Sequence, residues 1–311
     1  MTARAETLLN SASSLGRTVD ALFLSVLGIT GLVAVAVATL IVFFAVRYRA
    51  GSDADRSNPP TRARWIEICW TVTPLAIFIG LFVWSSVVFS DFYRPPPNAM
   101  RIHVLAKQWM WKLEHDNGRR EIDELHVPAG QPVELIMTSQ DVIHSFFVPA
   151  FRVKQDVLPG RYTSLWFTAT RPGRFNLFCA EYCGTQHAGM HGSVVVMQPA
   201  DFAQWLATTP GQQDLPSQGF EIYRRAGCSG CHEPTSTVHA PALAGLFGRT
   251  VHLTDGSTVV ADDNYIRDSI LLPDKQVAAG FAPAMPSYQG QLDEEDLRAL
   301  IAFIAAQRTS Q

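Results

Sequence analysis

The sequence contains few charged residues and lacks the basic tracts that typically bind nucleic acid. Only 17% of its 311 residues are charged, and the formal net charge is -3. It also lacks the cysteine count of a disulfide-stapled protein, because its five cysteines comprise one single residue and two closely spaced pairs. Residues 1–20 contain no apolar run long enough for the hydrophobic part of a signal peptide. We therefore expect neither a nucleic-acid partner nor a disulfide framework.

Charge is absent altogether from two long stretches. Residues 21–46 would form about 39 Å of helix at 1.5 Å per residue, and residues 68–90 would form roughly 34 Å. Two uncharged runs of this length disfavour buried helices of a soluble protein and predict a transmembrane hairpin over 21–94, preceded by an N-terminal segment, 1–20.

The segment between these two runs is basic. It carries Arg47, Arg49, Arg56, Arg62 and Arg64 against only Asp53 and Asp55. Short loops rich in arginine stay in the cytoplasm, so both ends of the hairpin and everything after Asp91 should lie on the outer face. The chain is thus expected to be a two-pass protein of a bacterial inner membrane.

Beyond the membrane, residues 95–208 have the pattern of an all-β domain. Short strand-forming runs alternate with turns such as 128–130, 159–160 and 171–173. This spacing is typical of a sandwich or barrel. The expected strands are 102–113, 132–138, 162–168, 175–178 and 193–197, and a short helix is expected at 200–208.

The last part of the chain is expected to be a separate, mostly helical domain, 219–311. A polar stretch without apolar periodicity, 209–218, is the expected linker. Residues 292–306 carry an apolar stripe at helical spacing, with the acidic residues 293–296 at the start, where they suit a helix dipole.

A dense cluster of metal-ligand residues lies between 179 and 190. Cys179, Cys183, His187 and Met190 fall within this segment, and His144 precedes it. Thiolate, thioether and imidazole together favour copper, and two cysteines favour thiolates that bridge two copper ions. Zinc bound by two cysteines and two histidines, or a disulfide, remains possible on spacing alone. His191 is a local rival to His187.

A second cofactor is indicated by Cys228-Ser229-Gly230-Cys231-His232, the Cys-x-x-Cys-His pattern of c-type haem attachment. A redox Cys-x-x-Cys is disfavoured by the adjacent histidine. Met285 is the only methionine after His232, which makes it the expected distal iron ligand, and His239 and His252 are the competing imidazoles. Ligation by His and Met raises the haem potential, which suits an electron carrier.

The arrangement Cys-x-Glu-x-Cys-Gly-x-x-His-x-x-Met, preceded by an isolated His, resembles the CuA site of cytochrome c oxidase subunit II. Together with the hairpin and the haem motif, the resemblance covers almost the whole chain and extends to members with a fused class I cytochrome c. It implies a multidomain membrane protein: an N-terminal transmembrane α-hairpin, an all-β cupredoxin domain (a Greek-key β-barrel) and a C-terminal all-α class I cytochrome c domain.

The resemblance also implies residue roles. The binuclear CuA ligands would be His144, Cys179, Cys183, His187 and Met190, with the backbone carbonyl of Glu181. The Glu181 carboxylate would face a magnesium site shared with the catalytic subunit. Trp109, within an aromatic patch where Met110 replaces the usual tyrosine, would be the point of electron entry. Glu67 would be the entrance of a proton channel, and Lys154 and Asp156 match a segment near the subunit interface.

The function that this resemblance implies is a linear electron path. An external donor, either cytochrome c or an upstream respiratory complex, would reduce haem c on Cys228, Cys231, His232 and Met285. The electron would pass to CuA and on to the catalytic haem–copper subunit I, which reduces dioxygen to water with proton translocation alongside other oxidase subunits. The alternative is a nitric oxide reductase small subunit built from the same modules.

Overall fold

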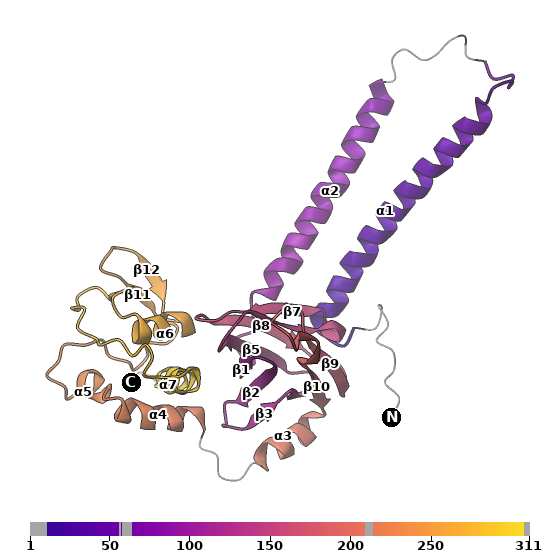
Figure 1. Cartoon of the computed structure of the whole chain (residues 1–311). Coiled ribbons are helices and arrows are strands. Elements are labelled where there is room, and N and C mark those ends of the chain that lie inside the picture. The colour runs from indigo at the N-terminus through magenta and orange to yellow at the C-terminus, as the bar shows by residue number, and fades with distance from the viewer. Residues whose placement is uncertain (1–10, 56, 58–63, 209–213, 308–311) are drawn as a thin grey trace.

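The chain folds into a helical hairpin, a β domain and a C-terminal helical domain, as Figure 1 shows. The structure is a computed structural model that describes residues 11–55, 57, 64–208 and 214–307. The predicted linker residues 209–213, the first half of the predicted N-terminal segment (1–10) and residues 56 and 58–63 of the arginine-rich loop lie outside the described residues.

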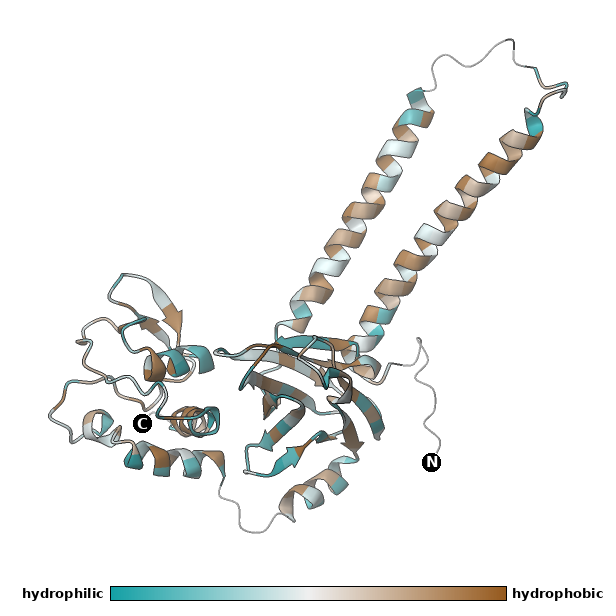
Figure 2. Cartoon of the chain, in the orientation of Figure 1, coloured by the Kyte–Doolittle hydropathy of each residue, from teal (hydrophilic) through white to brown (hydrophobic). Residues whose placement is uncertain are grey.

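The hairpin consists of α1 (Ser14–Arg47) and α2 (Arg64–Phe92), each longer than the uncharged run that predicted it. The most apolar 18-residue windows of the two helices are only 0% and 6% buried by the rest of the chain. Figure 2 shows apolar residues along both helices. Apolar helices left uncovered by their own chain require lipid or another apolar partner around them, in agreement with the predicted transmembrane hairpin.

Specific contacts attach the hairpin to the β domain. The Ser13 hydroxyl caps α1 by accepting from the backbone N–H of Gly16, and it donates to the carbonyl of Phe151 at 2.7 Å. Arg152 pairs with Asp20 on α1 at 2.7 Å. At the end of α2, the indole of Trp166 donates to the carbonyl of Asp91 at 2.9 Å. These contacts fix the β domain against the start of α1 and the end of α2.

Two five-stranded sheets pack face to face and enclose an apolar core centred on Trp111, Phe146, Phe151 and Phe167. Strands β1–β5 and β4–β10 pair in parallel, and the other pairs within the two sheets are antiparallel. The first sheet has the order β3 (Arg120–Ile122), β2 (Met110–His115), β1 (Met100–Lys107), β5 (Pro132–Ser139) and β8 (Thr163–Thr168). The second has the order β4 (Glu124–Pro128), β10 (His191–Met197), β9 (Gly173–Cys179), β6 (His144–Val148) and β7 (Val153–Val157).

One predicted strand was wrong. The run 102–113 is not a single strand, because the chain reverses at Gln108 and Trp109 and forms the antiparallel hairpin β1–β2. The turn contains no Gly, Pro, Asn or Asp, so the usual sequence signal of a reversal is missing. The other four predicted strands are present within one or two residues, as is the short helix α3 (Pro199–Ala207).

The C-terminal domain is built on four helices: α4 (Leu215–Arg225), α5 (Ser229–His232), α6 (Asp263–Leu271) and α7 (Glu294–Ala306). Helix α4 begins inside the stretch 209–218 that was expected to be linker. The side chains of Asp214, Asp262 and Asp293 cap α4, α6 and α7 respectively. A short hairpin, β11 (Thr250–His252) with β12 (Thr258–Val260), was not predicted.

Helices α4 and α7 cross at Gly219. A Cβ atom added to this residue would lie 2.0 Å from the carbonyl oxygen of Ala299 on α7. Only glycine therefore allows the two helices to approach this closely. The crossing holds together the core of the domain, in which Leu297, Leu300 and Ile301 are almost fully buried.

The C-terminal domain lies against the first sheet of the β domain through ion pairs and a backbone clamp. Nη2 of Arg101 donates to both carboxylate oxygens of Asp263, at 2.9 and 2.7 Å, and Arg298 pairs with Glu114 where both side chains are under a tenth exposed. Lys112 pairs with Glu295 at 2.9 Å. We call these residues, together with Tyr162, the interdomain seat.

The seat also has an apolar part. Ile136 and Tyr162 of the β domain belong to the same buried cluster as Leu215, Tyr265 and Ile266 of the helical domain. Burial raises the pKa of the Tyr162 hydroxyl above its ordinary value. The two domains therefore share a continuous core as well as salt bridges.

Candidate metal centre and haem site

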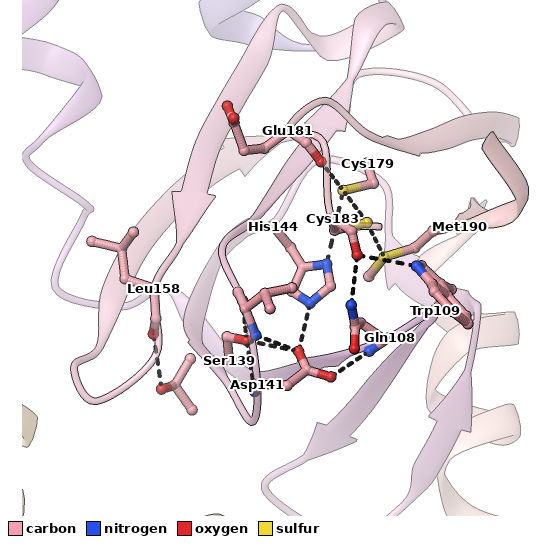
Figure 3. Close-up of polar contacts among 12 residues, drawn as sticks. Gln108, Trp109, Ser139, Asp141, His144, Leu158, Cys179, Glu181, Cys183 and Met190 are labelled. Atoms are coloured by element: carbon pink, nitrogen blue, oxygen red, sulfur yellow. Dashed lines mark hydrogen bonds and ion pairs between the residues drawn. The ribbon is translucent and has the colours of Figure 1, made fainter. Parts of the chain in front are cut away.

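The predicted metal ligands converge at one end of the second sheet, as Figure 3 shows for most of them. The thiol sulfurs of Cys179, at the end of β9, and Cys183 lie 3.8 Å apart. His144, the first residue of β6, presents Nδ1 at 4.0 Å from the Cys179 sulfur, and His187 presents Nδ1 at 3.5 Å from the Cys183 sulfur. The Met190 sulfur lies 3.8 Å from that of Cys183.

The remaining predicted donor is a backbone carbonyl. The carbonyl oxygen of Glu181 lies 3.2 Å from the Cys179 sulfur, while the Glu181 side chain is exposed. His191 begins β10 and its side chain is exposed. The group of His144, Cys179 and Cys183 places one ligand atom of each residue within 4.8 Å of the others, and all three are buried. The fold thus brings the ligands together because the β9–β10 loop lies next to the start of β6.

The electrostatics of the two thiols favour a bound cation. Burial opposes ionisation of Cys179, but the His144 imidazole helps to lower the pKa of this thiol below its ordinary value. Burial raises the pKa of Cys183, and the neighbouring Cys179 thiolate raises it further. Two adjacent buried thiolates repel each other unless a positive charge lies between them. A metal ion bound by both sulfurs supplies this charge.

The donor set fits copper better than the alternatives left open by the sequence. Cys179 and Cys183 are free thiols, so the pair is not a disulfide. A structural zinc site takes four ligands, whereas this cluster also offers a thioether and a carbonyl oxygen. Soft sulfur donors combined with imidazole are typical of copper electron-transfer sites.

Hydrogen bonds with residues around the ligands orient this cluster. The carboxylate of Asp141 lies 2.9 Å from Nε2 of His144, which leaves Nδ1 directed towards Cys179. The side-chain amide of Gln108 and the indole of Trp109 both donate to the carbonyl of Cys183, at 2.8 and 3.2 Å. The sequence alone assigned no role to Asp141 or Gln108, although an acidic residue three positions before a ligand histidine can indicate a carboxylate that orients the histidine ring.

Gly184 allows this close packing. Its φ of 115° is a conformation that side chains rarely adopt, and an added Cβ would lie 3.0 Å from the amide nitrogen of Gln108. Only glycine permits the loop to pass beneath the Gln108 and Trp109 side chains. The half-buried Trp109 is therefore held directly against the metal-binding loop.

The predicted haem residues line a single cavity of about 460 Å³ in the C-terminal domain, and they are Cys228, Cys231, His232 and Met285. The Nδ1 atom of His232 lies 2.9 Å from the carbonyl oxygen of Pro241, which fixes the ring and leaves Nε2 for a metal. Much of the remaining lining is apolar, from residues such as Leu243 and Ile270, as a macrocycle requires. The residues present therefore fit a covalently bound haem.

The competing imidazoles line the same cavity. His239 stacks on Phe281 with ring centroids 4.7 Å apart, and His252 lies in β11. Since Met285 also lines the cavity, the geometry brings all three candidates for the distal position together. The choice of Met285 remains a prediction.

The other predicted residues lie apart from both sites. Glu67 is exposed in the first turn of α2. Lys154 pairs with Asp156 at 3.0 Å, and the same carboxylate oxygen of Asp156 accepts a hydrogen bond from Ser145 at 2.8 Å. Asp156 is thus hydrogen-bonded to Ser145, the residue next to His144.

Comparison with known families accounts for the chain in three consecutive parts. Residues 3–88 match the cytochrome c oxidase subunit II transmembrane domain, and residues 119–198 match the periplasmic domain of the same subunit. Residues 216–307 match cytochrome c. The fold and these matches define a membrane-anchored protein that carries a periplasmic cupredoxin domain and a cytochrome c domain.

Individual relatives extend this result along the chain. Cytochrome c oxidase subunit 2 of Alkalihalophilus pseudofirmus is 29% identical over 303 residues, covering 92% of this chain and 85% of the relative. The subunit of the same name from Cereibacter sphaeroides is 30% identical over 223 residues, covering 58% of this chain and 74% of the relative. The chain belongs to the cytochrome c oxidase subunit II family.

A solved structure is also similar. The periplasmic domain of subunit II of the cytochrome oxidase of Bradyrhizobium japonicum is 31% identical, with a TM-score of 0.36, and the similarity covers 37% of this chain and 96% of that domain. Family membership implies CuA copper, and the cytochrome c domain implies haem c. The matches name cytochrome c oxidase throughout and do not favour the nitric oxide reductase alternative.

Proposed function

We propose that this chain is the electron-entry subunit of a terminal respiratory oxidase in a bacterial inner membrane. Electrons from cytochrome c or an upstream respiratory complex enter at the cytochrome c domain, pass to the copper centre, and leave to the catalytic subunit I. That subunit, with the other subunits of the complex, reduces dioxygen to water and translocates protons. The observation that carries this proposal is that a buried His–Cys–Cys cluster and a cavity lined by the Cys-x-x-Cys-His motif and Met285 lie in two domains of one chain that share a buried contact.

The copper site is proposed to be binuclear. Two thiol sulfurs 3.8 Å apart, each with its own imidazole, suit a pair of ions bridged by Cys179 and Cys183. His144, His187, Met190 and the Glu181 carbonyl complete the set. Bound there, the copper pair would supply one-electron chemistry, and the chain contributes mostly buried ligands that are held by hydrogen bonds with Asp141 and Gln108.

The haem is proposed to be attached through Cys228 and Cys231, with His232 and Met285 as axial ligands. His/Met ligation gives the haem a raised potential, which suits transfer to a copper acceptor. The apolar lining of the cavity disfavours the additional positive charge of the oxidised iron, and this also raises the haem potential.

Three further roles are proposed at single residues. Trp109, hydrogen-bonded to the Cys183 carbonyl, is the point at which a separately docked carrier would pass an electron directly to the copper site, beside the path from the fused haem domain. The exposed Glu181 carboxylate contributes to a magnesium site completed by subunit I. Glu67, exposed at the arginine-rich end of α2, is the entrance of a proton channel into subunit I.

The decisive experiment is purification of the intact complex from membranes, followed by parallel assays of oxygen and nitric oxide consumption. We expect oxygen consumption with a reduced c-type donor, together with copper and covalent haem in the subunit. A complex that reduces nitric oxide and consumes no oxygen would overturn the oxidase assignment. A complex without copper would overturn the assignment of the metal centre.

A further inference from the structure

A continuous series of bonds connects the wall of the haem cavity with the first copper ligand. It starts on α6, where Tyr265 lines the cavity and the preceding residue, Asn264, faces the β domain. The Asn264 side chain clamps the backbone of Tyr162: its Oδ1 accepts from the N–H at 2.7 Å, and its Nδ2 donates to the carbonyl at 3.3 Å. This clamp crosses the interdomain seat.

The series continues inside the β domain. Thr163, which follows Tyr162 at the start of β8, donates its hydroxyl to the backbone carbonyl of Asp156 at 2.8 Å. The side chain of Asp156 in turn accepts from the hydroxyl of Ser145 at 2.8 Å. Ser145 is fully buried and is covalently joined to His144.

Every non-covalent link on this route is a short hydrogen bond. The three links across Asn264, Thr163 and Ser145 measure 2.7, 2.8 and 2.8 Å, within the normal range for strong hydrogen bonds. Electronic coupling between redox centres falls off less steeply along covalent and hydrogen bonds than across van der Waals gaps. Between Tyr265 in the cavity wall and His144, the route consists only of such bonds, which makes this part a favourable path for an electron.

Other contacts of the interdomain seat hold α6 against the segment of the β domain that contains Tyr162. Arg267, three residues after Asn264, donates to the carbonyl of Gly160 at 2.7 Å, and the Arg101–Asp263 pair lies on the other side. Because Gly160 precedes Tyr162 by two residues, α6 contacts this segment of the β domain at two successive points. Among the described residues, none of the hydrogen bonds and ion pairs between the two domains involves Trp109.

We propose that the hydrogen-bonded series Asn264–Tyr162–Thr163–Asp156–Ser145 is the route by which an electron crosses from the cytochrome domain to the copper centre at His144. The proposal rests on the proposed function. With both cofactors bound, the step would move one electron and no proton, so that the haem would be oxidised by one electron and the copper centre reduced by one electron. Thr163 and the Ser145 hydroxyl are positioning groups in this route, since they bond to Asp156, and Ser145 also contacts the Cys179 thiol through its backbone N–H.

The test uses the assembled complex and the variant Thr163→Val, which preserves side-chain shape but removes the hydroxyl that bonds to Asp156. After photoreduction of the haem, the rate of its reoxidation by copper is measured. We expect a severalfold slowing with unchanged copper and haem spectra and an unchanged haem midpoint potential. Thr168→Val on the same strand is the matched control, because no hydrogen bond of its hydroxyl is recorded in the described part of the chain, and it should react at the wild-type rate.

Thr163→Val with intact spectra and a wild-type rate would overturn the route. If that variant fails to assemble, Ser145→Ala breaks the series one link later and carries the same expectation. A wild-type complex in which haem never reduces copper would instead refute the proposed function.

A second readout needs neither cofactor. Asn264→Leu should accelerate hydrogen exchange at the Tyr162 amide in the full chain, because this N–H loses its acceptor. Equal exchange in the wild type and the variant would mean that the clamp does not form in solution, and the route would be wrong.

Discussion

At the scale of single residues, the copper cluster shows why its ligands were predictable and its supports were not. His144 and the donors between Cys179 and Met190 are chemically distinctive, so their spacing alone indicated a metal site. Gln108 is an ordinary amide in the sequence. Its role at the Cys183 carbonyl depends on the β1–β2 turn, which no turn-forming residue marks.

Replacement of one bridging thiol tests the ligand set directly. Cys183→Ser should abolish the near-infrared and mixed-valence copper signals while the haem spectrum remains intact, because the haem cavity lies in a different domain. Copper analysis, electron paramagnetic resonance and optical spectra of the same sample measure this. Unchanged copper content and signals would refute the site.

The distal haem ligand can be tested in the same way. Met285→Ala should remove any sulfur-to-iron band and lower the midpoint potential of the haem, since Met ligation raises it. His239→Ala and His252→Ala are matched controls from the wall of the same cavity and should leave both properties unchanged. Loss of the native spectrum in one of the controls, and not in Met285→Ala, would identify the histidine as the ligand.

His103 is buried beneath the interdomain seat and gives a pH dependence. Burial, together with the nearby Arg298 and Arg101, lowers its pKa well below 6.5, while Asp116 lies 3.9 Å from its Nε2. Below pH 6.5 the unfolded chain binds a proton that the folded chain does not, so the free energy of unfolding should fall as the pH is lowered, with a slope that approaches about 1.4 kcal/mol per pH unit. The loss begins at the unfolded pKa and continues down to the folded one.

Denaturant unfolding of the full chain in detergent between pH 7 and 5.5 measures this effect. His103→Gln should remove this part of the pH slope, and the difference between variant and wild type cancels the contributions of other groups. Parallel slopes for the two proteins would show that His103 stays protonated or solvated in the folded state.

At the scale of elements, strongly periodic segments were predictable and irregular ones were not. The two apolar helices and the amphipathic α7 follow from runs or stripes in the sequence, and their ends lie within four residues of prediction except at the start of α1, which begins seven residues earlier. The hairpin β11–β12 was missed although Asp255 and Gly256 mark its turn. Its strands are only three residues long, too short for alternation to be visible.

The crossing of α4 and α7 supplies a stability test at this scale. Gly219→Ala should destabilise the C-terminal domain by about 1–3 kcal/mol, because the new methyl group overlaps the Ala299 carbonyl and one helix must move. Gly230→Ala is the control, since an added Cβ there meets no atom within 4 Å. Denaturation midpoints at constant slope give the difference. Equal midpoints for both variants would mean that the helices do not cross this closely.

At the scale of the whole molecule, the arrangement of the domains could not be predicted from the sequence. The seat joins residues more than 100 positions apart, such as Arg101 with Asp263 and Glu114 with Arg298. Nothing in the sequence marks these acids as partners of the two arginines, and only folding brings them together. Breaking a buried pair leaves an uncompensated charge, so these contacts stabilise one relative orientation of the two cofactor-binding domains.

The central claim is that both cofactors of this chain work in series within one molecule. The most direct measurement is a single-turnover experiment on the assembled complex, in which the haem is reduced by a light pulse and the haem and copper absorbances are followed together. We predict that haem reoxidation and copper reduction share one rate constant that does not change with protein concentration. A rate that rises with concentration, or copper that is reduced while the haem remains reduced, would contradict this account.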